Sequence, residues 1–134
     1  MVPVKVAISG QPGTGKTKTV LRIAKMIEDK FKIGGFTTNP IREDGEITGF
    51  NLKDFTTGEE ELSASVLWDV KPKIPGMNPE SRPLGIRLDA VNRIATSSVE
   101  KAIEESDLIL VDEVGKLVSE SKEFSAILKE ALKC

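Results

Sequence analysis

The hydrophobic and polar positions of the first 31 residues indicate a strand followed by a helix. Residues 4–9 form an almost continuous apolar run, which is typical of a strand covered on both faces. Residues 19–31 carry apolar side chains at helical spacing, which predicts a helix with one apolar face. The predicted face consists of Val20, Ile23, Ala24, Ile27 and Phe31.

Three apolar segments separated by turn residues predict an antiparallel β-meander after this first strand and helix. The expected strands cover residues 33–38, 46–55 and 62–66. Asp44-Gly45 and Thr57-Gly58 between them are tight-turn signals. We therefore expect the chain to reverse direction twice before it continues into its second half.

The second half of the chain predicts a long loop followed by a helix, a strand and a helix. Residues 71–83 contain four of the seven prolines, so we expect an irregular segment that is either a substrate-side flap or a connector. Trp68, just before it, is expected to be an aromatic residue at the edge of the core rather than a base-stacking side chain. Residues 108–111 predict a buried parallel strand. The two helices are predicted from the apolar positions Leu88, Val91, Ala95, Val99, Ala102 and Ile103, and then Phe124, Ile127, Leu128, Ala131 and Leu132.

Between the first strand and the first helix lies a glycine-rich loop that fits G-x-x-x-x-G-K-[ST], the Walker A or P-loop pattern. Its glycines let backbone N–H groups approach a phosphate closely, and the start of the following helix adds partial positive charge. The lysine supplies a full charge for the β and γ phosphates, and the threonine hydroxyl can bind Mg²⁺. The predicted nucleotide-binding residues are Gly10, Gln11, Pro12, Gly13, Thr14, Gly15, Lys16 and Thr17.

Asp112 and Glu113 follow directly after the predicted strand at residues 108–111. A buried parallel strand delivers such residues to the carboxyl edge of its sheet, where α/β folds bind ligands. Asp112 then fits a Walker B role in holding Mg²⁺, directly or through water, and Glu113 could activate or position water for attack on the γ-phosphorus. Both residues are counted among the nucleotide-binding residues. The alternative is that they form a helix N-cap and a first-turn acid, but the upstream P-loop favours the functional interpretation.

Composition restricts the chemistry further. The chain has 134 residues, a net charge of −2 and no histidine, so acid–base catalysis falls to Asp, Glu or Lys. The acidic balance gives no general reason to expect nucleic-acid binding or attraction to a membrane surface. Cys134 alone cannot form an internal disulfide, and no apolar run is long enough to span a bilayer. We expect one domain over residues 1–134 in the cytoplasm.

Several motifs, taken together and in order, resemble a known family. After the P-loop come Gly35-Phe36-Thr37-Thr38 with Arg42, then Thr48-Gly49-Phe50, then Val111-Asp112-Glu113-Val114-Gly115-Lys116, and later Phe124. The sequence is similar to the small P-loop nucleoside-triphosphatases of thermophilic prokaryotes, which have a vertebrate relative called cancer-related nucleoside-triphosphatase. The resemblance implies slow, Mg²⁺-dependent hydrolysis of ATP, GTP and other nucleoside triphosphates with poor base selectivity. It maps the family's glutamate onto Glu113 and adds Gly115 to the nucleotide-binding residues.

The chain also departs from the family pattern. Leu117 and Val118 stand where the family commonly has Met-Glu, and Pro40 stands where it has a glutamate. Family members usually continue past the last helix with a further strand and helix, whereas this sequence ends at Cys134. Among the arginines that could contact the γ-phosphate, Arg42 and Arg87 are the candidates, while Arg82 and Arg93 are expected to be solvated or structural.

These observations together predict a three-layer α/β P-loop NTPase fold, with a mostly parallel sheet and an inserted antiparallel β-meander. The predicted activity is hydrolysis of nucleoside triphosphates, with Glu113 and Lys16 as catalytic residues and with Mg²⁺ held by Thr17 and Asp112. Two alternatives stay open at this point. A nucleoside or nucleotide kinase would bind the phosphates in the same way but transfer the γ-phosphoryl group to an alcohol or phosphate acceptor instead of water. A non-catalytic module would use bound nucleotide as a switch.

Overall fold

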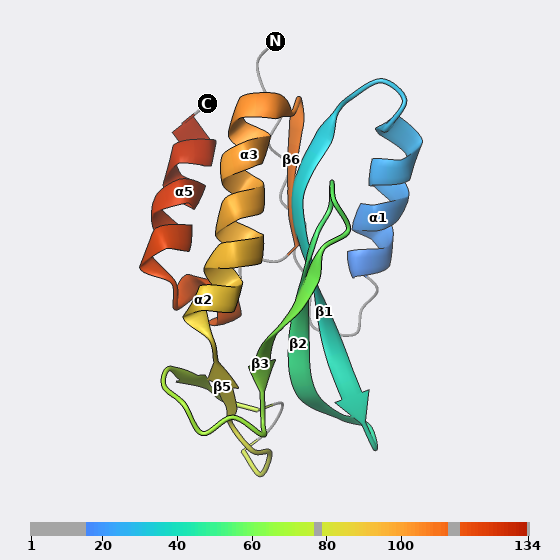
Figure 1. Ribbon diagram of the computed structural model, residues 1–134. Helices are drawn as coiled ribbons and strands as arrows, with labels where there is room; N and C mark the ends of the chain where they lie inside the picture. Colours follow the sequence, from blue (N-terminus) through green and yellow to red (C-terminus); the bar gives the residue numbers. More distant parts are fainter. Residues whose placement is uncertain (1–15, 77–78, 113–115, 134) are drawn as a thin grey trace.

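The computed structural model describes residues 16–76, 79–112 and 116–133. Within these ranges, six strands form one sheet in the order β4-β5-β3-β2-β1-β6. Helices α3 and α5 lie together on one side of this sheet, and α1 lies on the other side of β1 and β2 (Figure 1). The predicted strand at residues 4–9 and the glycine loop at residues 10–15 lie outside the described ranges. The strands are β1 Ile33–Glu43, β2 Glu46–Asp54, β3 Glu60–Ser65, β4 Lys73–Ile74, β5 Leu84–Ile86 and β6 Leu108–Asp112.

The helices mostly follow the apolar periodicity of the sequence. The first predicted helix is confirmed, although α1 begins and ends a few residues earlier than expected. The helix expected over residues 88–105 is one continuous helical segment that contains a π-helical turn, η1. The short helix α4 was not predicted. The helices are α1 Lys16–Ile27, α2 Leu88–Val91, η1 Asn92–Thr96, α3 Ser97–Glu105, α4 Lys116–Ser119 and α5 Lys122–Lys133.

The sheet is mixed, which corrects the expectation of a mostly parallel one. Among the strands that the structure describes, β1 and β6 are parallel and the other four pairings are antiparallel. The meander of β1, β2 and β3 forms as predicted, with turns at Asp44-Gly45 and around Gly58. The antiparallel content exceeds the expectation because β4 and β5, in and after the proline-rich segment, extend the meander as further strands. That segment is therefore not wholly irregular.

Strand β1 is longer than β6 and continues beyond it. The parallel pairing runs from Ile33 opposite Leu108 to Thr37 opposite Asp112. β1 then continues to Glu43, paired only with β2 among the described strands. Six further residues at about 3.3 Å each give an arm roughly 20 Å long past the end of β6. We call residues 38–51 the β1–β2 arm.

The core lies between the sheet and the pair of helices α3 and α5. Phe36 on β1 meets Phe124 on α5 edge-to-face, with ring centroids 5.6 Å apart. Leu52 of β2 and Val99 of α3 are fully buried in the same cluster. Gly34 is required at this contact, since a Cβ there would lie 2.8 Å from the Cβ of Ala102. The even-numbered positions of β1 near Phe36 therefore face the helices α3 and α5.

Some predicted apolar positions are less buried than the sequence pattern indicated. Ile23 on α1 is 44% exposed and Leu132 on α5 is 58% exposed, although both belong to predicted apolar faces. Residues 108–111 of β6 are only half-buried, because β6 is the last strand of the described sheet. The apolar patterns thus identified these helices and this strand correctly but overestimated how deeply their apolar side chains are buried.

Gly35 is where β1 and β6 approach most closely, and we predict that alanine is poorly tolerated there. Its φ is +118°, and a Cβ would lie 1.8 Å from the carbonyl oxygen of Leu110. Gly35→Ala should lower the free energy of unfolding by about 3 kcal/mol or more, because backbone strain and a backbone clash combine. Gly58→Ala is the matched control, since Gly58 also has positive φ but open space around it. The control should lose only about 1–2 kcal/mol in urea denaturation. Equal losses would contradict the clash.

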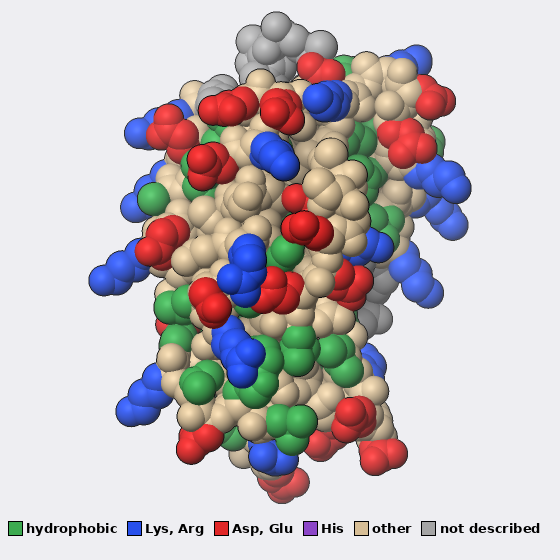
Figure 2. Space-filling model, viewed as in Figure 1, with side chains coloured by type: hydrophobic (Ala, Val, Ile, Leu, Met, Phe, Trp, Pro, Cys, Tyr) green, Lys and Arg blue, Asp and Glu red, His purple; other side chains and the backbone are tan. Residues whose placement is uncertain are grey.

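The surface seen in Figure 2 separates into two regions. Acidic and basic side chains are interspersed over its upper part, whereas apolar side chains gather at its lower end, where Figure 1 shows β5. Leu67 and Val70, 80% and 39% exposed, belong to the segment just before this end of the sheet. Within the described ranges, no helix has the length and apolar character needed to cross a membrane.

Candidate nucleotide site

The structure describes only part of the predicted nucleotide site. Lys16 and Thr17 are the first two residues of α1, and Asp112 is the last residue of β6. Residues 10–15, Glu113 and Gly115 lie outside the described residues. The glycine motif therefore leads directly into a helix of 12 residues, as a phosphate-binding loop requires. The unpaired N–H groups at such a helix start favour an anion.

Asp112 lies beside Thr37 at the carboxyl end of β6. The two residues are Cα partners in the parallel register, and each is only 5% exposed. Since side chains alternate along a strand and Phe36 faces α5, Thr37 and its partner Asp112 face the opposite side of the sheet. Figure 1 shows α1 on that side. The structure thus places Asp112 on the sheet face toward which α1 lies.

The residue types at this position suit a hard cation. Mg²⁺ in nucleotide sites is typically held by one or two carboxylates and by substrate phosphates, with water completing the octahedron. Asp112 supplies a carboxylate at the carboxyl end of β6, so its residue type and position fit this role. Within the described ranges, no three His, Cys, Asp or Glu side chains cluster as a metal cage. Asp112 with the hydroxyl of Thr17 remains the predicted ligand set.

Three of the four arginines considered as phosphate ligands are engaged elsewhere. The guanidinium carbon of Arg87 lies 4.1 Å from the centroid of the Trp68 ring, a cation–π contact. Arg82 donates to the backbone oxygen of Val66 at 3.0 Å, and Arg93 pairs with Glu61. Arg87 is therefore a poor candidate for the γ-phosphate. The half-buried Trp68 packs against Gly85 and Arg87, as expected for an aromatic residue at the edge of the core.

Arg42 is exposed and forms no side-chain hydrogen bond or ion pair with another described residue. It lies on the β1–β2 arm, five residues beyond Thr37, which is the position level with Asp112. Five strand residues span about 17 Å, a distance longer than an arginine side chain. We therefore do not expect Arg42 to reach a phosphate held beside Asp112.

A groove of about 520 Å³ lies along the β1–β2 arm, and the sequence pattern did not predict it. The residues that line it include Ile41, Gly49, Leu62 and Arg82. Ile41 is four residues beyond Thr37, so it shares the sheet face of Thr37 and Asp112. The acidic residues Glu43, Asp44 and Glu46 also line the groove. The groove is therefore partly acidic, and Ile41 in its lining lies about 13 Å along β1 from the position level with Asp112.

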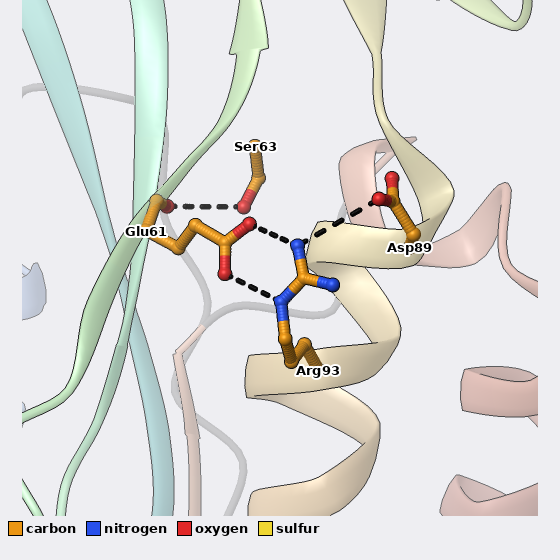
Figure 3. Close-up of polar contacts among 4 residues, drawn as sticks. All are labelled: Glu61, Ser63, Asp89 and Arg93. Carbon is orange, nitrogen blue, oxygen red and sulfur yellow. Dashed lines mark hydrogen bonds and ion pairs between the residues drawn. The ribbon is translucent and has the colours of Figure 1, made fainter.

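On the other face of the sheet, an ion pair connects β3 to the helical segment that begins at α2. Nε of Arg93 donates to Oε1 of Glu61 at 2.8 Å, and Nη2 of Arg93 pairs with Oε2 of the same carboxylate (Figure 3). Asp89 Oδ2 lies 3.7 Å from Nη2 of Arg93. The hydrogen bond from Arg93 lowers the pKa of the Glu61 carboxyl below its usual value. This contact joins β3 to the helical segment, and the Arg93 side chain stays largely exposed. Arg93 is therefore a solvated, structural residue, as the sequence predicted.

The lowered pKa of Glu61 predicts a pH dependence of stability. A carboxyl whose pKa is lower in the folded state stabilises the protein above its unfolded pKa, and this contribution is lost as pH falls through the folded pKa. Glu61→Gln should therefore lower Tm slightly at pH 7 and reduce the fall in Tm between about pH 5 and pH 3. Glu59→Gln, an exposed neighbour, is the control and should keep the original slope. The prediction is wrong if the two variants have the same Tm profile.

A protein-family model described as NTPase matches residues 5–134, nearly the whole chain. The chain belongs to this NTPase family. The family resemblance predicted from the motifs is thereby confirmed.

Named relatives in the NTPase family support the assignment. The protein called nucleoside-triphosphatase THEP1 from Methanocaldococcus jannaschii is 30% identical over 131 residues, which cover 97% of this chain and 72% of the relative. The protein of the same name from Methanosarcina acetivorans is 33% identical, with 96% and 70% covered. The solution structure of a human cancer-related nucleoside triphosphatase matches with a TM-score of 0.65 at 20% identity, over 92% of this chain and 67% of that one. This last match shows that the α/β fold is shared.

Proposed function

We propose that this chain is an enzyme that hydrolyses nucleoside triphosphates to the diphosphate and phosphate. The observation that carries the proposal is the position of Asp112, a buried carboxylate at the end of a parallel strand, on the sheet face toward α1. The glycine motif leads into that same helix. Membership of the NTPase family and the names of its relatives support the same activity.

In the proposed site, each part of the chain acts on a different part of the substrate. Backbone N–H groups of residues 10–15 and the start of α1 bind the phosphates, and Lys16 neutralises charge on the β and γ phosphates. The hydroxyl of Thr17 and the carboxylate of Asp112 would hold Mg²⁺. Bound there, Mg²⁺ would supply positive charge that offsets the negative charge developing on the transferring phosphoryl group. Glu113 accepts a proton from the attacking water or holds that water in line with the γ-phosphorus.

All of these proposed contacts are made to phosphates, metal or water, and none is made to a base. We therefore propose a broad base specificity for ATP, GTP and other nucleoside triphosphates. The three-layer P-loop arrangement, with the predicted strand at residues 4–9 in the same sheet, is part of this proposal. A single domain over residues 1–134, a cytoplasmic location and the lack of nucleic-acid binding stay predictions of the sequence.

Phosphate release in the presence of Mg²⁺ and each of ATP, GTP, CTP and UTP tests the proposal against its two alternatives. Hydrolysis predicts phosphate release from all four without any added acceptor, and loss of release when EDTA removes Mg²⁺. A kinase would consume ATP only when a nucleoside or nucleotide acceptor is supplied. A switch module would bind nucleotide tightly and release no phosphate over hours.

A further inference from the structure

Helix α1 presents an exposed face that is both apolar and basic. Met26 is 74% exposed, and Leu21 is also exposed. Arg22 and Lys25 are exposed beside them, because residues three and four apart are neighbours on a helix surface. The ion pairs found within the described ranges involve neither of these two cations. The helix contains no Asp or Glu that could offset their charge.

The groove along the β1–β2 arm has an apolar part that is open to solvent. A Cβ at Gly49 would lie 3.4 Å from Cδ1 of both Ile41 and Leu62. The missing side chain at Gly49 therefore leaves a hollow between two apolar side chains. Leu62 and Leu67, which both line the groove, are exposed. A contiguous apolar surface that is bordered by polar residues is typical of an interaction site.

The polar border of this groove is predominantly acidic. Glu43 and Glu46 are Cα partners on β1 and β2, and like charges directly opposite each other are destabilising. Asp44 adds a third carboxylate, and Arg82 supplies a guanidinium. Among the described lining residues, three carboxylates and one guanidinium leave a net charge of −2. A partner with exposed cations would therefore be electrostatically complementary to the groove.

The exposed face of α1 suits this groove in length and in position. A helix of 12 residues is about 18 Å long, and the β1–β2 arm is about 20 Å long. Ile41 in the groove lies on the side of the sheet where α1 lies, and the arm extends past the end of α1 (Figure 1). A two-fold axis between helix and groove can therefore place α1 of each copy in the groove of the other. Such an isologous arrangement is the commonest one among homodimers.

We propose that the groove of the β1–β2 arm is a docking site for α1 of a second copy of this chain, in a symmetric dimer. Arg22 and Lys25 of one copy lie against the acidic border of the other, and Leu21 and Met26 cover its apolar lining. Two such contacts form at once. The proposal concerns association and does not depend on the proposed hydrolysis.

Sedimentation velocity of the full chain, from micromolar to near-millimolar concentration, tests the association. The wild type should show a reversible monomer–dimer equilibrium that shifts toward monomer between about 0.1 M and about 1 M salt, because salt screens exposed charges. The α1-reversed chain carries Arg22→Glu with Lys25→Glu, and the arm-reversed chain carries Glu43→Lys with Glu46→Lys. Each should raise the dimer dissociation constant about 100-fold or more, since like charges then meet in both contacts. All four positions are exposed, so the circular dichroism spectrum should stay that of the folded chain.

A mixture of the two reversed chains makes the test specific. The α1-reversed chain has an acidic helix and an acidic arm, whereas the arm-reversed chain has a basic helix and a basic arm. Both contacts are complementary in a mixed dimer, so the equimolar mixture should dimerise although neither chain does so alone.

The matched control is Lys122→Glu with Lys129→Glu, which makes the same charge change on exposed positions of α5, on the other side of the sheet. This control should dimerise like the wild type. A wild type that is monomeric at every concentration, reversed chains that dimerise as the wild type does, or a mixture that stays monomeric would overturn the inference. Species larger than a dimer would overturn the two-fold arrangement.

Discussion

Replacing Lys16 by alanine is expected to reduce phosphate release from ATP by about a hundredfold to a thousandfold. Lys16 is the first residue of α1, directly after the glycine loop, and it is the lysine of the P-loop motif. Its charge is proposed to stabilise the negative charge that builds on the transferring phosphoryl group. The measurement is steady-state phosphate release with saturating Mg²⁺ and ATP.

Lys18→Ala is the matched control for this prediction. Lys18 lies two residues further along α1 and is exposed, so its removal changes the net charge by the same amount. The control should keep activity within about twofold, as surface substitutions usually do. If both variants lose activity equally, the effect comes from overall charge or from helix stability, and the P-loop role of Lys16 is contradicted.

The second large effect is expected for Glu113→Gln, which keeps the shape of the side chain but removes its basicity. Activity should fall by about a hundredfold or more, since general-base catalysis contributes that much or more. Nucleotide affinity should persist, because the phosphate-binding groups are unchanged. Equilibrium binding of ATP and single-turnover hydrolysis measure these two quantities separately.

Glu120→Gln provides the comparison for Glu113→Gln. Glu120 is exposed in the turn between α4 and α5, a few residues after Glu113, and the substitution is chemically the same. It should hydrolyse ATP at the wild-type rate. Full activity of Glu113→Gln would show that another group prepares the water, and loss of nucleotide binding in that variant would show that Glu113 has a binding role instead.

The sequence predicted the order and type of the longer elements because each carries a strong periodic signal. Phe124 and Ala131 recur at helical spacing and are buried on α5, and the turn at Asp44-Gly45 joins β1 and β2 as expected. The short strands β4 and β5 were missed, because two or three residues among prolines have no periodicity to detect. The π-helical turn η1 has no sequence signal of its own.

The candidate site was predictable in its chemistry but not in its surroundings. The glycine motif and Asp112 follow from residue types and spacing, and the structure places Asp112 at the end of a parallel strand as expected. The neighbour of Asp112 could not be predicted, because the register of β1 against β6 decides that Thr37 is opposite it. Thr37 stands in a family motif, but the motif does not show that Thr37 lies beside Asp112.

The central claim is that water attacks the γ-phosphorus of a nucleoside triphosphate in this site. Hydrolysis of ATP in water enriched in oxygen-18, followed by mass spectrometry of the products, tests it most directly. The account predicts one oxygen-18 atom in the released phosphate and none in ADP, with product formation by Lys16→Ala about a hundredfold to a thousandfold slower under the same conditions. Label in ADP, unlabelled phosphate, or nucleotide that binds and stays intact would contradict the account.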